Sequence, residues 1–287
     1  MRENTAFFVK KLNYNEYRTK LGLKKGISQT GGKMMALYYV KEKDIKIEKK
    51  NGYGCSEMLA GTYPGGVHAI RCLLDAGAYV DEVPGQETLE ICCFTSGRGA
   101  VLCGGHAYAV EELSFFVPEP GQPFTVHAAT DMIWTRFSVE QKPGDQARYA
   151  SFHMRLPFFK PYSQCTEYIQ DVHSSRSESR SVIPTKRLCR VLMGTMMADA
   201  EGCAEPQGCF EKGHPAVAQW NVLFGDNKLL LTVDGESVEL EGNDFSYVPA
   251  GCDHSLQCQP GAKIGYIWFE HYVLEKDYLV SYPQSKS

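Results

Sequence analysis

Two successive series of short apolar segments limit the fold of this 287-residue sequence more than any other feature. The segments recur about every 8–12 residues and are bounded by Gly, Pro, Asp and Asn, which is the pattern of a β-barrel or sandwich. The first series comprises Ala69–Leu74, Thr88–Phe94, Ala100–Cys103, Glu112–Val117 and Met132–Val139. The second comprises Leu188–Met197, Trp220–Phe224, Leu229–Val233, Ser237–Leu240, Phe245–Val248, Ser255–Cys258 and Ile264–Phe269. Long helical periodicity is scarce, so the sequence predicts an all-β chain.

The two series also share the spacing of their turn residues, which indicates an internal repeat. Glu90 is followed seven residues later by Gly97, and Ala218 is followed seven residues later by Gly225. In the second series the dipeptide Asp234-Gly235 separates two strand-like segments and predicts a tight β-hairpin.

The segment Gly242–His254 carries the most specific motif of the chain. It reads as a Gly, six residues, Pro-x-Gly, two residues and a His. Here the Gly-Asn-Asp start would turn the chain, the next four residues would form a strand, and Pro-Ala-Gly would bend it towards the strand that begins near His254. In this motif the sequence resembles the cupin superfamily. With the weaker first copy it resembles a bicupin over about residues 65–272, which implies two cupin-type β-barrels (double-stranded β-helix, or jelly roll) in tandem with few helices.

The composition of the chain suggests how these barrels are divided. We predict an N-terminal arm at residues 1–34, with a short helix around Asn15–Lys24, and an N-terminal barrel at residues 35–140. A polar, Ser- and Arg-rich stretch at residues 141–186 is expected to connect it to the C-terminal barrel at residues 187–287.

The resemblance also implies where a metal would bind. In metal-binding cupins the first motif supplies two His and a carboxylate, and the second motif supplies one more His. The matching positions in the C-terminal half are Lys212, His214, Ala218 and His254, so two ligands match and two do not. Some similar cupins use a Gln one position after the usual carboxylate, and Gln219 stands there. We therefore predict that His214, Gln219 and His254 bind a divalent Mn, Fe, Ni or Zn ion.

The same resemblance implies a metal-dependent isomerase, lyase or hydrolase that acts on a small polar carboxylate, such as a sugar acid or a ureido acid. Glu211 and Lys212 are the nearest candidates for a catalytic acid and base, and Lys212 could instead bind a substrate carboxylate. The incomplete ligand set leaves a second interpretation open, in which the barrel binds a sugar or another small molecule without catalysis, as a sensor would. A purely structural or oligomeric scaffold is a third.

The N-terminal half matches the metal motif even less well. The corresponding positions are Pro84, Gln86, Glu90 and Phe124, which leaves one carboxylate and no imidazole. His127 lies three residues after Phe124 and is expected to face the other side of its strand. We therefore predict a degenerate site in this barrel.

Charge and cysteine content bound the partners and the compartment. The formal net charge is −4, which gives no reason to expect a nucleic acid or a membrane surface as a partner. The 11 cysteines are odd in number and lack the C-x2-C spacing of zinc sites, so we expect reduced thiols and a cytoplasmic protein. The resemblance implies a homodimer. Arg71, Arg136 and Arg190 lie in strand-like segments, where they would either bind a carboxylate substrate or form structural ion pairs.

Overall fold

The computed structural model describes residues 37–63, 66–145, 154–169, 177–199, 209–211, 217–259 and 261–273, with the backbone alone at 185–186 and 209–211. The predicted arm at residues 1–34 and its helix lie outside these residues.

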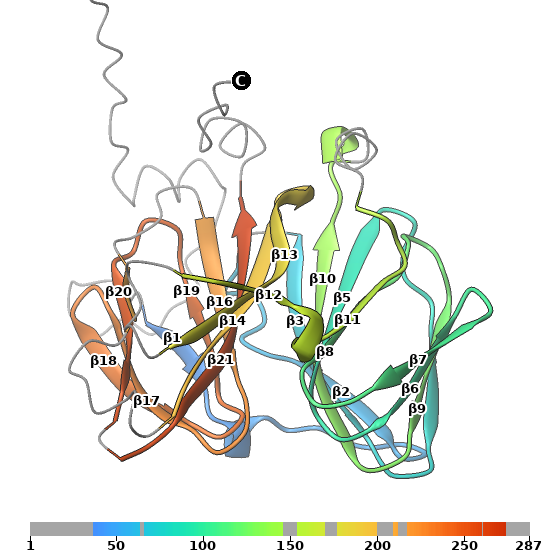
Figure 1. The fold of residues 1–287 in the computed structure, drawn as a ribbon, viewed down its shortest axis with the longest axis horizontal. Helices are drawn as coiled ribbons and strands as arrows, with labels where there is room; N and C mark the ends of the chain where they lie inside the picture. Colours follow the sequence, from blue (N-terminus) through green and yellow to red (C-terminus); the bar gives the residue numbers. More distant parts are fainter. Residues whose placement is uncertain are drawn as a thin grey trace, which may run out of the picture. The chain divides into compact units, whose positions relative to one another are not determined.

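Within the described residues, the N-terminal half forms two antiparallel sheets that face each other as a barrel (Figure 1). The six-stranded sheet has the order β11-β8-β5-β10-β3-β2, and the four-stranded sheet has the order β4-β9-β6-β7. The strands are β2 (Tyr53–Glu57), β3 (Val67–Leu74), β4 (Tyr79–Glu82), β5 (Thr88–Ser96), β6 (Gly99–Cys103), β7 (His106–Val110), β8 (Ser114–Val117), β9 (Phe124–Ala128), β10 (Met132–Glu140) and β11 (Phe158–Pro161).

The C-terminal half repeats this arrangement. Its sheets have the orders β1-β19-β16-β21-β14-β13-β12 and β15-β20-β17-β18. The strands are β1 (Tyr38–Val40), β12 (Thr166–Tyr168), β13 (Glu178–Leu188), β14 (Val191–Ala198), β15 (Cys209–Glu211), β16 (Val217–Leu223), β17 (Lys228–Val233), β18 (Glu236–Glu241), β19 (Phe245–Val248), β20 (His254–Cys258) and β21 (Ile264–Tyr272). Two short 3-10 helices, η1 (Glu42–Asp44) and η2 (Tyr162–Gln164), complete the described elements. The predicted all-β fold of two tandem barrels is confirmed.

Four strands lie elsewhere than the sequence suggested. β1 falls in the range assigned to the N-terminal barrel, but it pairs with β19 of the C-terminal half. The stretch expected to be a connection contains β11, which pairs with β8, β12, which pairs with β13, and most of β13 itself. The pairings of β1 and β11 join residues far apart in the sequence, so no local pattern could have indicated them.

The two large sheets pack against each other and share one hydrophobic core. Phe137 of β10 stacks on Phe269 of β21 with ring centroids 4.0 Å apart. Cys93 of β5 lies with its sulfur 3.4 Å from that of Met193 on β14. A single cluster of buried apolar side chains therefore includes residues of both barrels.

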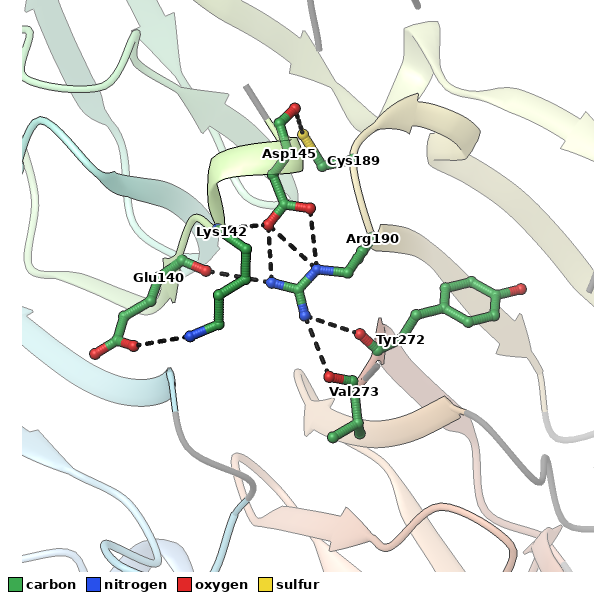
Figure 2. A network of polar contacts seen from close by, with 7 residues as sticks. All are labelled: Glu140, Lys142, Asp145, Cys189, Arg190, Tyr272 and Val273. Carbon is green, nitrogen blue, oxygen red and sulfur yellow. Dashed lines mark hydrogen bonds and ion pairs between the residues drawn. The ribbon is translucent and has the colours of Figure 1, made fainter. Parts of the chain in front are cut away.

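A buried ion pair joins the two halves at the edge of this core (Figure 2). The guanidinium of Arg190, in the turn between β13 and β14, donates from Nη2 to Oδ2 of Asp145 at 2.9 Å. It also donates to the carbonyl oxygens of Tyr272, at 3.0 Å, and Glu140, at 3.4 Å. Arg190 thus contacts the ends of β10 and β21, which belong to different barrels.

The state of the cysteines corrects one expectation. Eight described cysteines are free thiols: Cys55, Cys72, Cys92, Cys93, Cys103, Cys165, Cys189 and Cys252. Cys258, however, is disulfide-bonded, so the expectation of reduced thiols throughout is wrong. A disulfide depends on which cysteines meet in the fold, and the spacing of cysteines along the chain does not show this.

Candidate functional site in the C-terminal barrel

His254 reaches the interior of the C-terminal barrel through the motif that predicted it. Gly242 has a φ of 56°, which allows the turn before β19, and Gly251 has a φ of 86° in the bend after it. β20 then begins at His254, whose side chain is buried. The buried His254 thus follows the turn and the bend that the motif predicts.

Gln219 lies beside His254 in the barrel. Ala218 belongs to the core between the sheets, so the alternation along β16 turns Gln219 towards the barrel interior. Its Oε1 lies 3.2 Å from Nε2 of His254, and both side chains are almost fully buried. The structure therefore brings together two of the three predicted metal ligands.

A row of polar side chains continues from this pair. Gln219 Nε2 donates to Oδ1 of Asn221 at 2.9 Å, and Asn221 Nδ2 donates to Oγ of Ser246 at 3.1 Å. All of these side chains are buried. Buried amides are held in fixed orientations by such bonds, so the position of the Gln219 oxygen depends on Asn221 and Ser246.

The remaining predicted site residues are described only in part. The backbone of Glu211 pairs with His254 across β15 and β20, while its side chain lies outside the described atoms. Lys212 and His214 lie outside the described residues. Their roles stay predictions.

Glu270 is a candidate that the sequence reasoning missed. It lies on β21 directly opposite Gln219 of β16. Directly paired residues project their side chains to the same face of a sheet, so Glu270 faces the barrel interior with Gln219. The alternation along Ile264–Phe269 could have found it, because Ile267 and Phe269 belong to the core between the sheets and Glu270 has the opposite parity. His271, in contrast, is buried outside the barrel interior, and burial lowers the pKa of its imidazole well below the usual value.

The interior of the N-terminal barrel is filled. Phe124 is buried in an apolar cluster with Phe94, Phe116 and Trp134, and His127 is exposed on the other side of β9. Glu90 accepts a hydrogen bond from Ser138 Oγ at 2.9 Å, and its Oε2 lies 3.6 Å from Arg136 Nε. Burial raises the pKa of Glu90, while Arg136 acts against this shift. Phe124 thus packs into the apolar interior, and the Glu90 carboxylate is engaged by Ser138 and Arg136.

The three arginines that the sequence placed in strand-like segments have structural partners, and Arg190 lies in the turn between β13 and β14. Arg136 pairs with Glu82 and lies near Glu90, and Arg190 pairs with Asp145. Arg71 donates to the carbonyl oxygen of Asn243 at 2.9 Å. Of the two alternatives for these arginines, the described contacts favour the structural one.

Within the described part of the chain, no group of three or more His, Cys, Asp or Glu side chains is placed to hold a metal ion. His254 and Glu270 are only two such side chains, and Gln219 would contribute an amide oxygen, which is a ligand of a different kind. In the same residues no helix is long and apolar enough to cross a membrane.

Comparisons with known proteins agree with this architecture. A family model described as "AraC-like ligand binding domain" matches residues 83–192. Among curated proteins, no sequence matches the chain significantly.

Solved structures match at the level of fold. A putative glyoxylate-induced protein from Pseudomonas aeruginosa is 10% identical with a TM-score of 0.67, and the match covers 88% of this chain and 95% of that one. A Lactobacillus farciminis oxalate decarboxylase in complex with formate is 11% identical with a TM-score of 0.62, covering 88% and 92%. A cupin 2 conserved barrel domain protein from Leptotrichia buccalis is 11% identical with a TM-score of 0.55, covering 84% and 98%. These matches show that the chain shares the fold of these structures, a tandem pair of cupin-type β-barrels.

Proposed function

We propose that the C-terminal barrel binds a divalent metal ion through Nε2 of His254 and Oε1 of Gln219. His214 is the predicted third ligand, and Glu270 offers a carboxylate on the same face as Gln219. The proposal is supported by one observation above all: the 3.2 Å approach of Nε2 and Oε1 inside the barrel.

This approach has the spacing of two ligands to one ion. Two atoms that each lie about 2.1 Å from a metal are about 3.0 Å apart in octahedral geometry and about 3.4 Å apart in tetrahedral geometry. Nδ1 of His254 lies 3.3 Å from the carbonyl oxygen of Cys252. The Cys252 carbonyl and the Gln219 oxygen both only accept, and a neutral imidazole carries one ring proton. With that proton on Nδ1, Nε2 presents a lone pair to the Gln219 oxygen, and a metal ion bound between the two atoms would satisfy both.

The proposed activity is isomerase, lyase or hydrolase chemistry on a small polar carboxylate such as a sugar acid or ureido acid. A bound divalent ion would polarise a carbonyl or carboxylate oxygen of the substrate. Glu211 and Lys212 are the proposed acid and base, because the backbone of Glu211 pairs directly with His254. In the structure with formate, the similar oxalate decarboxylase holds a small carboxylate of this general kind.

A second candidate function is binding of a sugar or other small molecule without catalysis. The polar row favours it, because the amides of Gln219 and Asn221 can both be rotated by 180°. Gln219 would then donate to His254 Nε2, and Ser246 would donate to Asn221, so the row would be satisfied without an ion. The family model described as a ligand binding domain supports small-molecule binding by a barrel of this type, and the residues that it matches, 83–192, lie mainly in the N-terminal barrel.

Metal analysis of the purified protein tests the proposal. We expect about one Mn, Fe, Ni or Zn ion per chain, and its loss in a His254→Ala variant, because the imidazole is the strongest described donor. A Gln219→Glu variant should bind the same ion roughly tenfold more tightly, because a carboxylate binds a divalent cation more strongly than an amide oxygen does.

The matched control is His68→Ala, which removes an exposed imidazole that pairs with Glu57 in the other barrel. Its metal content should equal that of the wild type. If the metal-depleted wild-type protein takes up no added ion, or if the Gln219→Glu variant binds no more tightly, the metal proposal fails. Ligand binding by metal-free protein would then favour the second function. The gain expected for Gln219→Glu keeps the test decisive if His254→Ala does not fold.

A further inference from the structure

One outer face of the N-terminal barrel is unusually apolar. It belongs to the sheet β4-β9-β6-β7, and we call it the N-terminal outer face. Tyr79 is 61% exposed on it, Val83 at its margin 73%, and Leu102 40%. These are three of the five large hydrophobic side chains that are exposed among the described residues. Ala107 and Ala109 of β7 are exposed on the same face.

The repeat within the chain shows that the fold does not require this. The equivalent sheet β15-β20-β17-β18 of the C-terminal barrel turns Lys228, Glu239 and Glu241 outward, and Lys228 pairs with Glu239 at 3.6 Å. An outer face of this kind is normally polar because it meets water. The apolar character of the N-terminal outer face is therefore a property of its own sequence.

The edge strands of the two sheets differ in the same way. β18 reads Glu-Ser-Val-Glu-Leu-Glu, and its three carboxylates protect an edge from pairing with another chain. β7 reads His-Ala-Tyr-Ala-Val and contains no Lys, Arg, Asp or Glu. In the described residues β7 ends its sheet, so its edge is open to a further strand.

The same face carries a projection and a hollow. Tyr79 stacks on His127 with ring centroids 5.4 Å apart, which holds the exposed phenol ring in one orientation. Towards the other end of the sheet a hollow of about 420 Å³ is lined by the apolar Val83 and Leu102 and also by Asp81, His106 and Glu82, of which Glu82 pairs with Arg136. In a two-fold contact the same surface of each copy faces the other. A face that carries both a projection and a hollow can therefore fit its own copy, with each projection in the other copy's hollow.

We propose that the N-terminal outer face binds a second copy of this chain, with Tyr79 of each copy in the hollow of the other. The low charge of this face favours a second copy as the partner. Contact between two copies brings like charges together, so only a face with few charges can contact its own copy without repulsion. Asp81 is the one carboxylate on the strand positions of this face, and it accepts a hydrogen bond from Thr125 at 2.6 Å. The acidic face of the C-terminal barrel would repel its own copy.

Two variants that destroy the contact separately and restore it when mixed would test the proposal. We expect the wild type to be a dimer by sedimentation, and the Tyr79→Glu and Leu102→Lys variants to be monomers. In a homodimer of either variant both contacts are damaged. In a mixed dimer one contact is native, and the other places the new carboxylate against the new ammonium. Mixing the two variants should therefore restore at least half of the chains to dimers.

The matched control is Ile169→Glu, which changes a side chain that is 95% exposed elsewhere. It should leave the dimer intact, and circular dichroism should show that all variants are folded. A monomeric wild type, a dimer that survives both variants, or a failure of mixing to restore dimers would each overturn the proposal. If a monomeric wild type instead bound a different protein through this face, that result would also contradict the proposal.

Discussion

At the scale of single residues, the question is how much a buried ion pair contributes to the stability of a chain made largely of apolar strands. Arg190 and Asp145 are 4% and 2% exposed in their side chains. The guanidinium also donates to carbonyl oxygens at the ends of β10 and β21 (Figure 2). Removing one member of such a pair leaves the other charge buried without compensation.

We therefore expect Asp145→Ala to lower the free energy of unfolding by about 3–5 kcal/mol. Urea denaturation followed by tryptophan fluorescence would measure this change. The control is Glu239→Ala, which removes the exposed partner of Lys228 and should cost less than about 1 kcal/mol. Equal effects of the two substitutions would show that Arg190 does not depend on Asp145.

At the scale of elements, the turns explain why the strands could be placed from the sequence. Asp234 and Gly235 have φ values of 48° and 85°, which is the hairpin conformation that the dipeptide predicts. Gly97 and Gly225 follow the ends of β5 and β16 with φ values of 89° and 67°, as their equal spacing suggested. Glycine adopts these positive φ values readily, whereas a residue with an L side chain is strained there.

Gly235→Ala should therefore destabilise the protein by about 1 kcal/mol, because alanine is strained at this φ. Asp234→Asn, at the preceding residue of the same turn, keeps the oxygen that accepts from the N–H of Asp253 and tolerates the positive φ, so it should have a smaller effect or none. Thermal unfolding of both variants would make the comparison. A destabilisation from Asp234→Asn as large as that from Gly235→Ala would contradict the assignment of strain to the second position.

What the sequence could not predict follows from the same local reasoning. Apolar segments bounded by turns identified β5, β10 and β19, whereas β4 and β7 are short and largely exposed and gave no such signal. In the candidate site, the motif predicted the turn and the bend that precede the buried His254. The alternation along β21 indicates which face Glu270 occupies, but its partner Gln219 is more than fifty positions away in the chain, so neither segment alone shows that the two residues meet.

At the scale of the whole molecule, the two barrels share one hydrophobic core, so they are not expected to unfold separately. Phe137 and Phe269 come from different barrels and are both fully buried. Cooperative units in proteins follow the contacts that are lost together. The described contacts therefore make a single unfolding unit from two similar halves.

We expect calorimetry to show one transition, which Phe137→Ala shifts to lower temperature as a whole. The loss of a buried aromatic ring should cost about 3–5 kcal/mol. As a control, Phe94→Ala removes a buried ring from the interior of the N-terminal barrel alone, and it should likewise shift one transition and not split it. Separation of the wild-type transition into two peaks would show that the barrels are thermodynamically independent.

The place of β1 has a consequence for how the chain acquires its structure. Tyr38–Val40 pairs with β19, and Glu42 donates its backbone N–H to Asp244 in the turn of the Gly242–His254 motif. During synthesis this strand leaves the ribosome well before the residues that it pairs with, and the entire N-terminal barrel is made in between. A gene fragment that encodes only the second barrel would lack this strand, so the two halves cannot be exchanged as cassettes at the midpoint of the sequence.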